Sequence, residues 1–276
     1  MPNARLLSLV YRKDMSMDKI KARRQSIVKL LESAPMIPVS ELAGLLGVTK
    51  ETVRKDLTAL EEQGLVVWRH GGAALTERNA APIPYALRES FHKEGKRQIA
   101  RAACALLQEG DSLLLESSTT TMALCQELLE RPELLKTLTI VTNSFYITQL
   151  FEMGGLVKRL FFLGGWLTCS EGATQGQYTY EALQQFHPDK AFLSGAALNE
   201  EMQLTAYYEN DMYFQQEAIR CAQCTILLLD KAKYLSTGFF AVSDLKSVRY
   251  LVTDAELPER VRERLRKRNV TFVLAK

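Results

Sequence analysis

Seven short apolar runs occupy the chain beyond residue 112, and they restrict its fold more than any other feature. Most of them are separated by segments in which apolar residues recur at helical spacing. The runs are Leu113–Leu115, Leu138–Thr142, Arg159–Leu163, Ala191–Ser194, Thr225–Leu229, Tyr250–Thr253 and Thr271–Leu274. This alternation predicts an α/β domain around a mainly parallel sheet. Because such sheets bind ligands at the carboxyl ends of their strands, we expect a binding site there.

Three amphipathic helices are predicted before this region. The first covers Lys19–Glu32, where apolar residues fall at helical spacing. Ser40 is placed to cap a short second helix that ends at Gly47, and Thr49 is placed to cap a third, from Lys50 to about Gln63. Two helices joined by a tight turn are what a helix-turn-helix requires to read the major groove.

The third helix has one apolar and one polar face. Val53, Leu57 and Leu60 are spaced to be buried together. The opposite face carries basic and hydroxyl side chains from Lys50, Thr52, Arg54, Lys55 and Thr58. Side chains of these types contact phosphates and base edges in DNA, although an ordinary three-helix cap or a module for protein contacts has the same pattern.

A predicted β-hairpin after this helix favours DNA. Leu65–Trp68 and Ala73–Leu75 are typical of two short strands, and Arg69–Gly72 of the turn between them, as in the wing of a winged helix. Residues 1–78 hold 13 Lys+Arg and 9 Asp+Glu, a net charge of +4, whereas the rest of the chain is near −1. The positive charge therefore lies in the part that would meet phosphates.

The residues GVTKETVRKDL from Gly47, followed by LEEQGLVVWRHGGA, resemble the N-terminal signature of the DeoR-type repressors of sugar metabolism. The resemblance implies that double-stranded operator DNA is the partner and that Asp56 and Glu61 are scaffold. The candidate DNA contacts are Ser40, Thr49, Lys50, Glu51, Thr52, Arg54, Lys55, Thr58, Arg69 and His70. We predict an extension over residues 1–18, a winged helix-turn-helix over 19–78, a proline-containing linker over 79–84 and an effector-sensing α/β domain over 85–276, opened by a helix from Tyr85 to about Gln108.

Polar residues follow three of the predicted strands. Glu116–Thr121 and Thr142–Ser144 each precede a helix, and Gly164–Gly165 follow a third strand. Hydroxyl groups and free backbone N–H groups at a helix start form a favourable phosphate site, although most Ser and Thr residues there are only caps. The three strand ends together favour a small phosphorylated ligand.

The second half of the chain also resembles the DeoR family, whose sensor domain is similar to the sugar-phosphate isomerase fold. The matching pieces are ESSTT, VTNS, LGG, FHPDKAFLSG and LLDKAKY. The resemblance implies that the effector pocket is lined or supported by Glu116, Ser117, Ser118, Thr119, Thr120, Asn143, Ser144, Gly164, Gly165, Asp189, Lys190, Asp230 and Lys233. Lys190 and Lys233 are candidate counter-charges for a phosphate, or solvated surface lysines.

The chain departs from the family pattern at several positions. Ser118 replaces a usual glycine, Gly195–Asn199 lacks the usual acidic residues, and Gln203 and Gln215 replace a usual glycine and lysine. An aldose–ketose isomerase needs a carboxylate base, so catalysis is not expected. A larger ligand could use Tyr207, Tyr208 and Glu209.

The remaining sequence features predict no metal, cofactor or membrane association. Five scattered cysteines are typical of reduced thiols in the cytoplasm, and the C-x-x-C of Cys221 and Cys224 favours packing over zinc. No apolar stretch approaches the roughly 18 residues of a membrane span. We therefore expect a cytoplasmic protein. The family resemblance implies that it represses a carbohydrate operon until a sugar phosphate binds, and the reading of an operator by a winged helix implies a homo-oligomer, a dimer or tetramer. The alternatives are an isomerase-like enzyme with an appended DNA-binding domain and a regulator with a decayed sensor.

Overall fold

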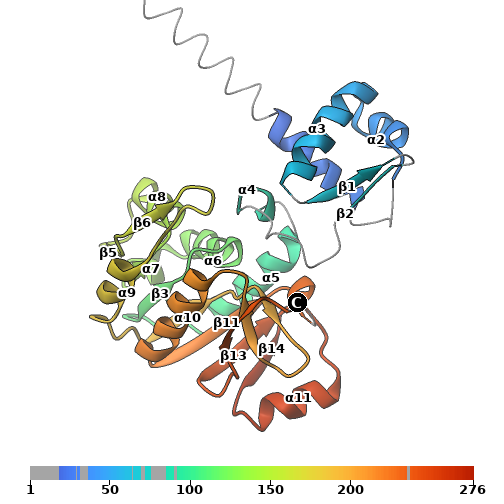
Figure 1. Ribbon diagram of the computed structural model, residues 1–276. Coiled ribbons are helices and arrows are strands. Elements are labelled where there is room, and N and C mark those ends of the chain that lie inside the picture. The colour runs from blue at the N-terminus through green and yellow to red at the C-terminus, as the bar shows by residue number, and fades with distance from the viewer. Residues whose placement is uncertain are drawn as a thin grey trace, which may run out of the picture. The chain divides into compact units, whose positions relative to one another are not determined.

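A computed structural model describes residues 19–28, 30–31, 37–63, 65–69, 72–75, 85–89, 92–234 and 237–276. The chain forms two compact units, Met1–Phe91 and His92–Lys276 (Figure 1). Three predicted features lie outside the described residues: the extension over 1–18, the linker over 79–84 and His70 at the wing turn.

The first unit contains a helix-turn-helix followed by a two-stranded antiparallel hairpin. Its elements are helical residues 19–28 and 30–31, α2 (Val39–Leu46), α3 (Lys50–Glu62), β1 (Val66–Arg69), β2 (Gly72–Leu75) and α4 (Tyr85–Arg88). The buried stripe of α3 packs into one apolar core with Ile27, Leu42 and Val66. In the hairpin, Arg69 lies opposite Gly72.

The predicted end of α2 and the predicted start of α3 are both confirmed. Gly47 ends α2 in the left-handed region at φ 64°, where glycine has no steric penalty. The side chain of Thr49 caps α3 by accepting from Thr52 N–H. The prediction that Ser40 caps α2 is wrong, because Pro38 is the N-cap residue and Ser40 lies exposed inside the first turn. The proline ring fixes φ at about −65°, which suits the residue at which this helix starts.

The second unit is a three-layer α/β structure whose central sheet has seven parallel strands, as predicted. The seven strands are the seven apolar runs, and their order is β14-β13-β11-β8-β3-β4-β5. The elements up to α9 are α5 (Lys93–Cys104), β3 (Ser112–Leu115), α6 (Thr119–Leu129), α7 (Pro132–Leu135), β4 (Thr139–Thr142), α8 (Phe145–Gly154), β5 (Arg159–Phe162), β6 (Trp166–Thr168), β7 (Ala173–Gln175) and α9 (Gln177–Leu183). The others are β8 (Lys190–Leu193), β9 (Ala197–Leu198), β10 (Leu204–Ala206), α10 (Glu209–Cys221), β11 (Cys224–Leu229), the 3-10 turn η1 (Lys231–Lys233), β12 (Phe240–Ser243), β13 (Val248–Thr253), α11 (Glu259–Arg266) and β14 (Thr271–Leu274).

The predicted continuous helix from Tyr85 to Gln108 is wrong. The chain forms α4 and a separate α5, which begins after His92. His92 has φ 49°, a left-handed conformation that a continuing helix does not contain. Periodic apolar residues alone could not show this break.

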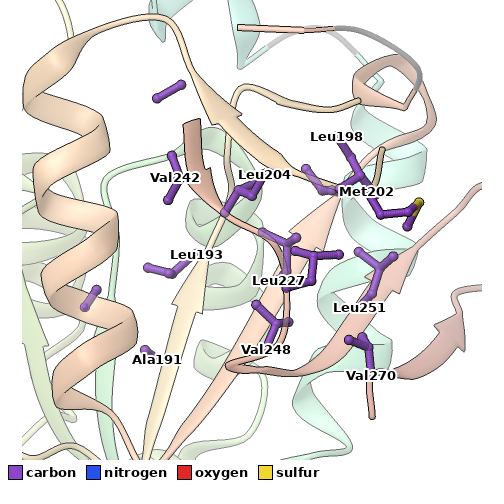
Figure 2. Close-up of a cluster of buried hydrophobic side chains, with 14 of the residues drawn as sticks. Ala191, Leu193, Leu198, Met202, Leu204, Leu227, Val242, Val248, Leu251 and Val270 are labelled. Carbon is purple, nitrogen blue, oxygen red and sulfur yellow. The ribbon is translucent and has the colours of Figure 1, made fainter. Parts of the chain in front are cut away.

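Alternating strand residues supply two separate cores, one on each face of the sheet. Leu113 and Leu115 pack with α5, α6 and α8, whereas Leu114 packs with residues of α9, α10 and α11. Figure 2 shows the second of these cores, where Leu193 and Leu227 of the sheet meet Leu204 of β10. Side chains alternate across a strand, so an all-apolar run requires helices on both faces.

Two small antiparallel sheets accompany the central sheet: the hairpin β6-β7 and the three-stranded sheet β12-β10-β9. Over the residues that the structure describes, we find no helix with the length and apolar character needed to cross a membrane.

Candidate DNA-binding face and effector site

Helix α3 presents the predicted face to solvent. Val53, Leu57 and Leu60 are fully buried, and the basic residues of the opposite face are exposed. The Arg54 side chain is 54% exposed, and its closest carboxylate contact is a 3.5 Å pair with Glu51. An arginine held this loosely can reorient toward DNA at little cost. Lys50, Lys55 and Thr58 are exposed on α3, and Thr52 is half-buried.

The scaffold roles implied for Asp56 and Glu61 correspond to specific contacts. Asp56 is buried and accepts from the Nε atoms of Arg23 and Arg24 at 2.5 and 3.0 Å, which ties α3 to the first helix, over residues 19–28. Glu61 accepts from the backbone N–H of Trp68 at 3.2 Å and so joins α3 to the hairpin. Charge-assisted hydrogen bonds of this kind fix the orientation of the exposed face.

The order of strands places the candidate effector residue Glu116 at a switch point. From β3 the chain proceeds outward through β4 and β5, and the later strands start on the other side with β8. Ligands of open α/β sheets bind at such a point, outside the carboxyl ends of the strands. Glu116 follows β3 there; its carboxylate accepts from Ser194 N–H and from Gln215 Nε2, both at 2.6 Å. Glu116 therefore bridges the ends of β3 and β8 to helix α10.

The ends of β3 and β4 are joined by side chains. Asn143 accepts from Ser117 N–H at 2.9 Å and donates to the carbonyl of Thr174 at 3.1 Å. The Ser117 hydroxyl donates to Ser144 Oγ at 3.2 Å, and Ser144 caps α8. Both functional groups of the Asn143 amide are thus used within the protein, so Asn143 positions the loops.

Helix α6 begins directly at the end of β3. Ser118 is its N-cap and accepts from Thr121 N–H at 3.0 Å. The first amide groups of a helix have no acceptor within it, and they carry the positive end of the helix dipole. Thr119 and Thr120 supply those amides and are buried, and the Thr120 hydroxyl has no hydrogen-bond partner in the structure.

The end of β5 contributes two glycines with different requirements. Gly164 has open space around its Cα, and its carbonyl accepts from Thr179 Oγ1 at 2.7 Å. Gly165 has φ 140°, and a Cβ there would lie 2.1 Å from the same hydroxyl. The site therefore tolerates no side chain at Gly165.

The structure separates the two candidate lysines. Lys233 lies at the carboxyl ends of the strands, where its Nζ donates to Ser194 Oγ at 2.9 Å and to the Gly195 carbonyl at 3.0 Å. Asp230 directly follows β11, three residues before Lys233, and is buried. Lys190 begins β8, at the opposite edge of the sheet, and its Nζ lies 2.5 Å from Asp111 Oδ2. Of the two lysines, only Lys233 thus lies with the loops that follow the carboxyl ends of the strands.

Asp189 lies with Lys190 at the amino ends of the strands. Its Oδ2 accepts from the backbone N–H and the hydroxyl of Ser112 at 2.8 and 2.6 Å. These hydrogen bonds hold the pKa of its carboxyl below the usual value. Asp189 fixes the start of β3 and is remote from the strand ends that carry Glu116.

Several residues of the site were not identified from the sequence. Ser194 and Gln215 complete the environment of Glu116, and Thr174 bonds to the loops that follow β4 and β5: its N–H donates to the Asn143 carbonyl at 2.9 Å, and its hydroxyl donates to the Leu163 carbonyl. The position of Ser194 at the end of an apolar run was an available signal. No sequence pattern pairs Gln215 with a residue 99 positions away.

The segment Gly195–Asn199, which lacks the acidic residues of the family pattern, contains a strand of the sheet β12-β10-β9. Ala197 and Leu198 form β9 and are buried. The Asn199 side chain donates to Gln203 Oε1 and accepts from the backbone N–H of Gln203. No carboxylate therefore enters the site from this segment.

The cysteines are all free thiols. Burial raises the pKa of both Cys221 and Cys224, which disfavours the thiolate that binds metals. Within the described ranges, no group of three or more His, Cys, Asp or Glu residues is placed to hold a metal ion.

Family models match both parts of the chain. A DeoR-like helix-turn-helix domain matches residues 23–79, and the DeoR C terminal sensor domain matches residues 91–255. The chain belongs to the DeoR family of transcriptional regulators. In this DeoR-family chain, α2 and α3 lie within the helix-turn-helix domain, and the unit built on the seven-stranded sheet contains the sensor domain.

Two curated relatives of this DeoR-family chain are named as repressors, and each aligns with it over most of its length. The HTH-type transcriptional repressor GlcR of Bacillus subtilis is 30% identical, over 84% of this chain and 87% of the relative. The glycerol-3-phosphate regulon repressor of Haemophilus influenzae is 28% identical, over 93% of this chain and 97% of the relative. Both relatives are therefore regulators by name, as is expected of the DeoR family.

A solved ribose 5-phosphate isomerase A from Methanocaldococcus jannaschii is similar at 18% identity and a TM-score of 0.38, over 51% of this chain and 54% of the isomerase. A likeness at this level does not bear on the function of the DeoR-family chain.

Proposed function

We propose that this chain represses a carbohydrate-metabolism operon by binding operator DNA through α3, and that a sugar phosphate or related metabolite relieves the repression. The observation that carries the proposal is the division of α3 into a fully buried apolar stripe and an exposed face with Lys50, Arg54 and Lys55. The name of the glycerol-3-phosphate regulon repressor supports a role in carbohydrate regulation.

The DNA-binding step is tested with a mobility-shift titration on the DNA upstream of the gene. Arg54→Ala should weaken binding by about 1–3 kcal/mol if Arg54 contacts a base, or lower the salt slope by about one if it contacts a phosphate. Arg97→Ala is the matched control, because Arg97 is an exposed arginine on the sensor unit. Unchanged affinity and salt slope for Arg54→Ala would contradict the proposed face.

The effector step rests on the start of α6 and on Lys233. The first amides of α6 would bind phosphate oxygens, and Lys233 would supply positive charge beside Ser194 and Gly195. The ligand would change the relative populations of two conformers of the regulator, one with weaker affinity for DNA.

Two lysine variants test the effector step in a thermal-shift panel of sugar phosphates. Lys233→Met should abolish the increase in melting temperature that the active compound causes in the wild type. Lys190→Met should preserve that increase, although it lowers the basal melting temperature by breaking the buried pair with Asp111. Equal ligand shifts in both variants would refute the role of Lys233. Failure of every sugar phosphate on the wild type would instead favour a decayed sensor.

Operator binding also implies more than one copy of the chain. A single winged helix-turn-helix contacts one half-site, and regulators of this type read two half-sites with a symmetric pair. We propose a homodimer or a dimer of dimers. The isomerase alternative predicts turnover of pentose or hexose phosphates by the purified protein; we expect none, because Ala197 and Leu198 occupy the segment that would supply acids.

A further inference from the structure

Exposed apolar side chains are concentrated around the β6-β7 hairpin. The described residues include ten large hydrophobic side chains that are exposed, and five of them lie on this hairpin or directly beside it. They are Phe145 (47% exposed), Phe161 (47%), Trp166 (76%), Leu167 (46%) and Tyr178 (68%), and we call them the hairpin patch. Single exposed hydrophobic residues are normal, but a concentration of this kind indicates a binding surface.

The segments that carry the hairpin patch are neighbours in the fold, and Trp166 and Leu167, which are consecutive in β6, cover opposite faces of the hairpin. Trp166 lies against the backbone of Gly176, at the start of the helix that carries Tyr178. Phe145 donates its backbone N–H to the carbonyl of Gly172, at the other end of the hairpin, at 2.8 Å. Phe161 lies in β5, the edge strand that leads into the hairpin.

The exposed area is large enough for an interface. Scaling the roughly 150–250 Å² that an aromatic side chain can bury by the exposures of the four aromatic residues gives about 500 Å² of apolar surface. That value is toward the upper end of what a monomer leaves exposed, and it is more than half of the roughly 800 Å² that each partner buries in a stable complex. A two-stranded hairpin is also only marginally stable without a covering surface.

We propose that a second copy of this chain covers the hairpin patch, so that this face is the dimer interface of the sensor domain. The inference rests on the proposed binding of operator DNA, which requires paired copies. A two-fold axis brings the same patch of both copies together. Strand β5 supports this arrangement, because among the described residues it pairs only with β4, which leaves its outer edge for the partner's β5.

The same hairpin contacts the effector site. Its β7 strand bonds to Asn143 through Thr174, and the carbonyl of Glu171 in its turn accepts from the Ser117 hydroxyl at 3.4 Å. A ligand that rearranges the loops after β3 and β4 therefore acts directly on the element that carries Trp166. The interface and the sensor thus share one structural element.

Sedimentation velocity of the full chain from about 1 to 100 μM, without DNA, tests the interface. The test variant is Trp166→Ser with Tyr178→Ser, and the control is Phe239→Ser, which alters an 85% exposed aromatic residue outside the patch. We expect the double variant to self-associate at least about thirty-fold more weakly, as for the loss of an interface hot spot. Circular dichroism confirms that each variant is folded.

Three results would overturn the proposal: a double variant that associates like the wild type, a wild type that stays monomeric throughout, and a Phe239→Ser variant that dissociates equally. The mobility-shift titration is separate. If the wild type does not bind the upstream DNA, the proposed function fails, and the sedimentation experiment still decides the interface.

Discussion

Replacing Asp56 should directly weaken the attachment of α3 to the first helix, which carries Arg23 and Arg24. The Asp56 carboxylate is 2% exposed and accepts from two arginine Nε atoms at 2.5 and 3.0 Å. In Asp56→Asn, one amide oxygen can still accept, but the amide NH₂ group faces the second arginine, so two donors oppose each other. Each hydrogen bond to a charged group contributes about 1.5–3 kcal/mol.

The expected loss follows from these contacts. Arg23 and Arg24 are 21% and 29% exposed, so each regains part of its hydration when its bond is lost. The free energy of unfolding of the N-terminal unit should therefore fall by about 2–3 kcal/mol. For a small domain this lowers the urea midpoint by about 1–2 M.

The measurement uses the full chain with Trp166→Phe, which leaves Trp68 of the hairpin as the only tryptophan. Trp68 packs against the core of the first unit, so its fluorescence reports the unfolding of that unit. Glu51→Gln is the control, because Glu51 is 65% exposed and meets Arg54 at 3.5 Å. The reasoning is refuted if Asp56→Asn lowers the urea midpoint no more than Glu51→Gln does.

Three further predictions concern the sensor unit. Gly165→Ala should destabilise it by about 2 kcal/mol or more because of its φ of 140° and the clash of a Cβ, whereas Gly164→Ala should have little effect; thermal melts of both variants compare them. Thr120→Val should be neutral or slightly stabilising, because its buried hydroxyl is unpaired. Thr142→Val should cost about 1–3 kcal/mol, because its hydroxyl donates to a carbonyl and accepts an N–H, and urea unfolding separates the two variants. Burial raises the pKa of the Cys104 thiol from 9.0 to about 12, so the thiol loses its proton at a higher pH in the folded state than in the unfolded state. Stability should fall as the pH rises from about 9 toward 12, and Cys104→Ala should remove part of that slope in melts at stepped pH; an unchanged slope would contradict this.

The sequence predicted the elements of the sensor domain well because their signals are local. All seven apolar runs are strands of the central sheet, since a strand buried on both faces must be apolar along its length. The turn at Gly47 and the cap at Thr49 are also local, because each depends on the backbone of a few neighbouring residues. The prediction that Ser40 caps α2 was wrong because the helix starts earlier, with Pro38 as its N-cap residue.

The two candidate lysines show the limit of sequence reasoning. Both stand in segments that resemble the family, yet Lys233 lies at the carboxyl ends of the strands and Lys190 at the amino end of β8. The predicted strands Ala191–Ser194 and Thr225–Leu229 already put Lys190 before one strand and Lys233 after another. The family resemblance grouped the two lysines, and only the assembled sheet shows that they lie at opposite ends of it.

The sequence alone determined that this chain has a helix-turn-helix with a basic face and a parallel α/β domain with polar strand ends, because periodicity and capping act within a few residues. Tertiary structure decided which strand ends meet. Only the placement of β8 beside β3 brings Ser194 to Glu116, and only the packing of α10 brings Gln215 there. Such contacts join residues 78 and 99 positions apart, and they exist only once the sheet has assembled.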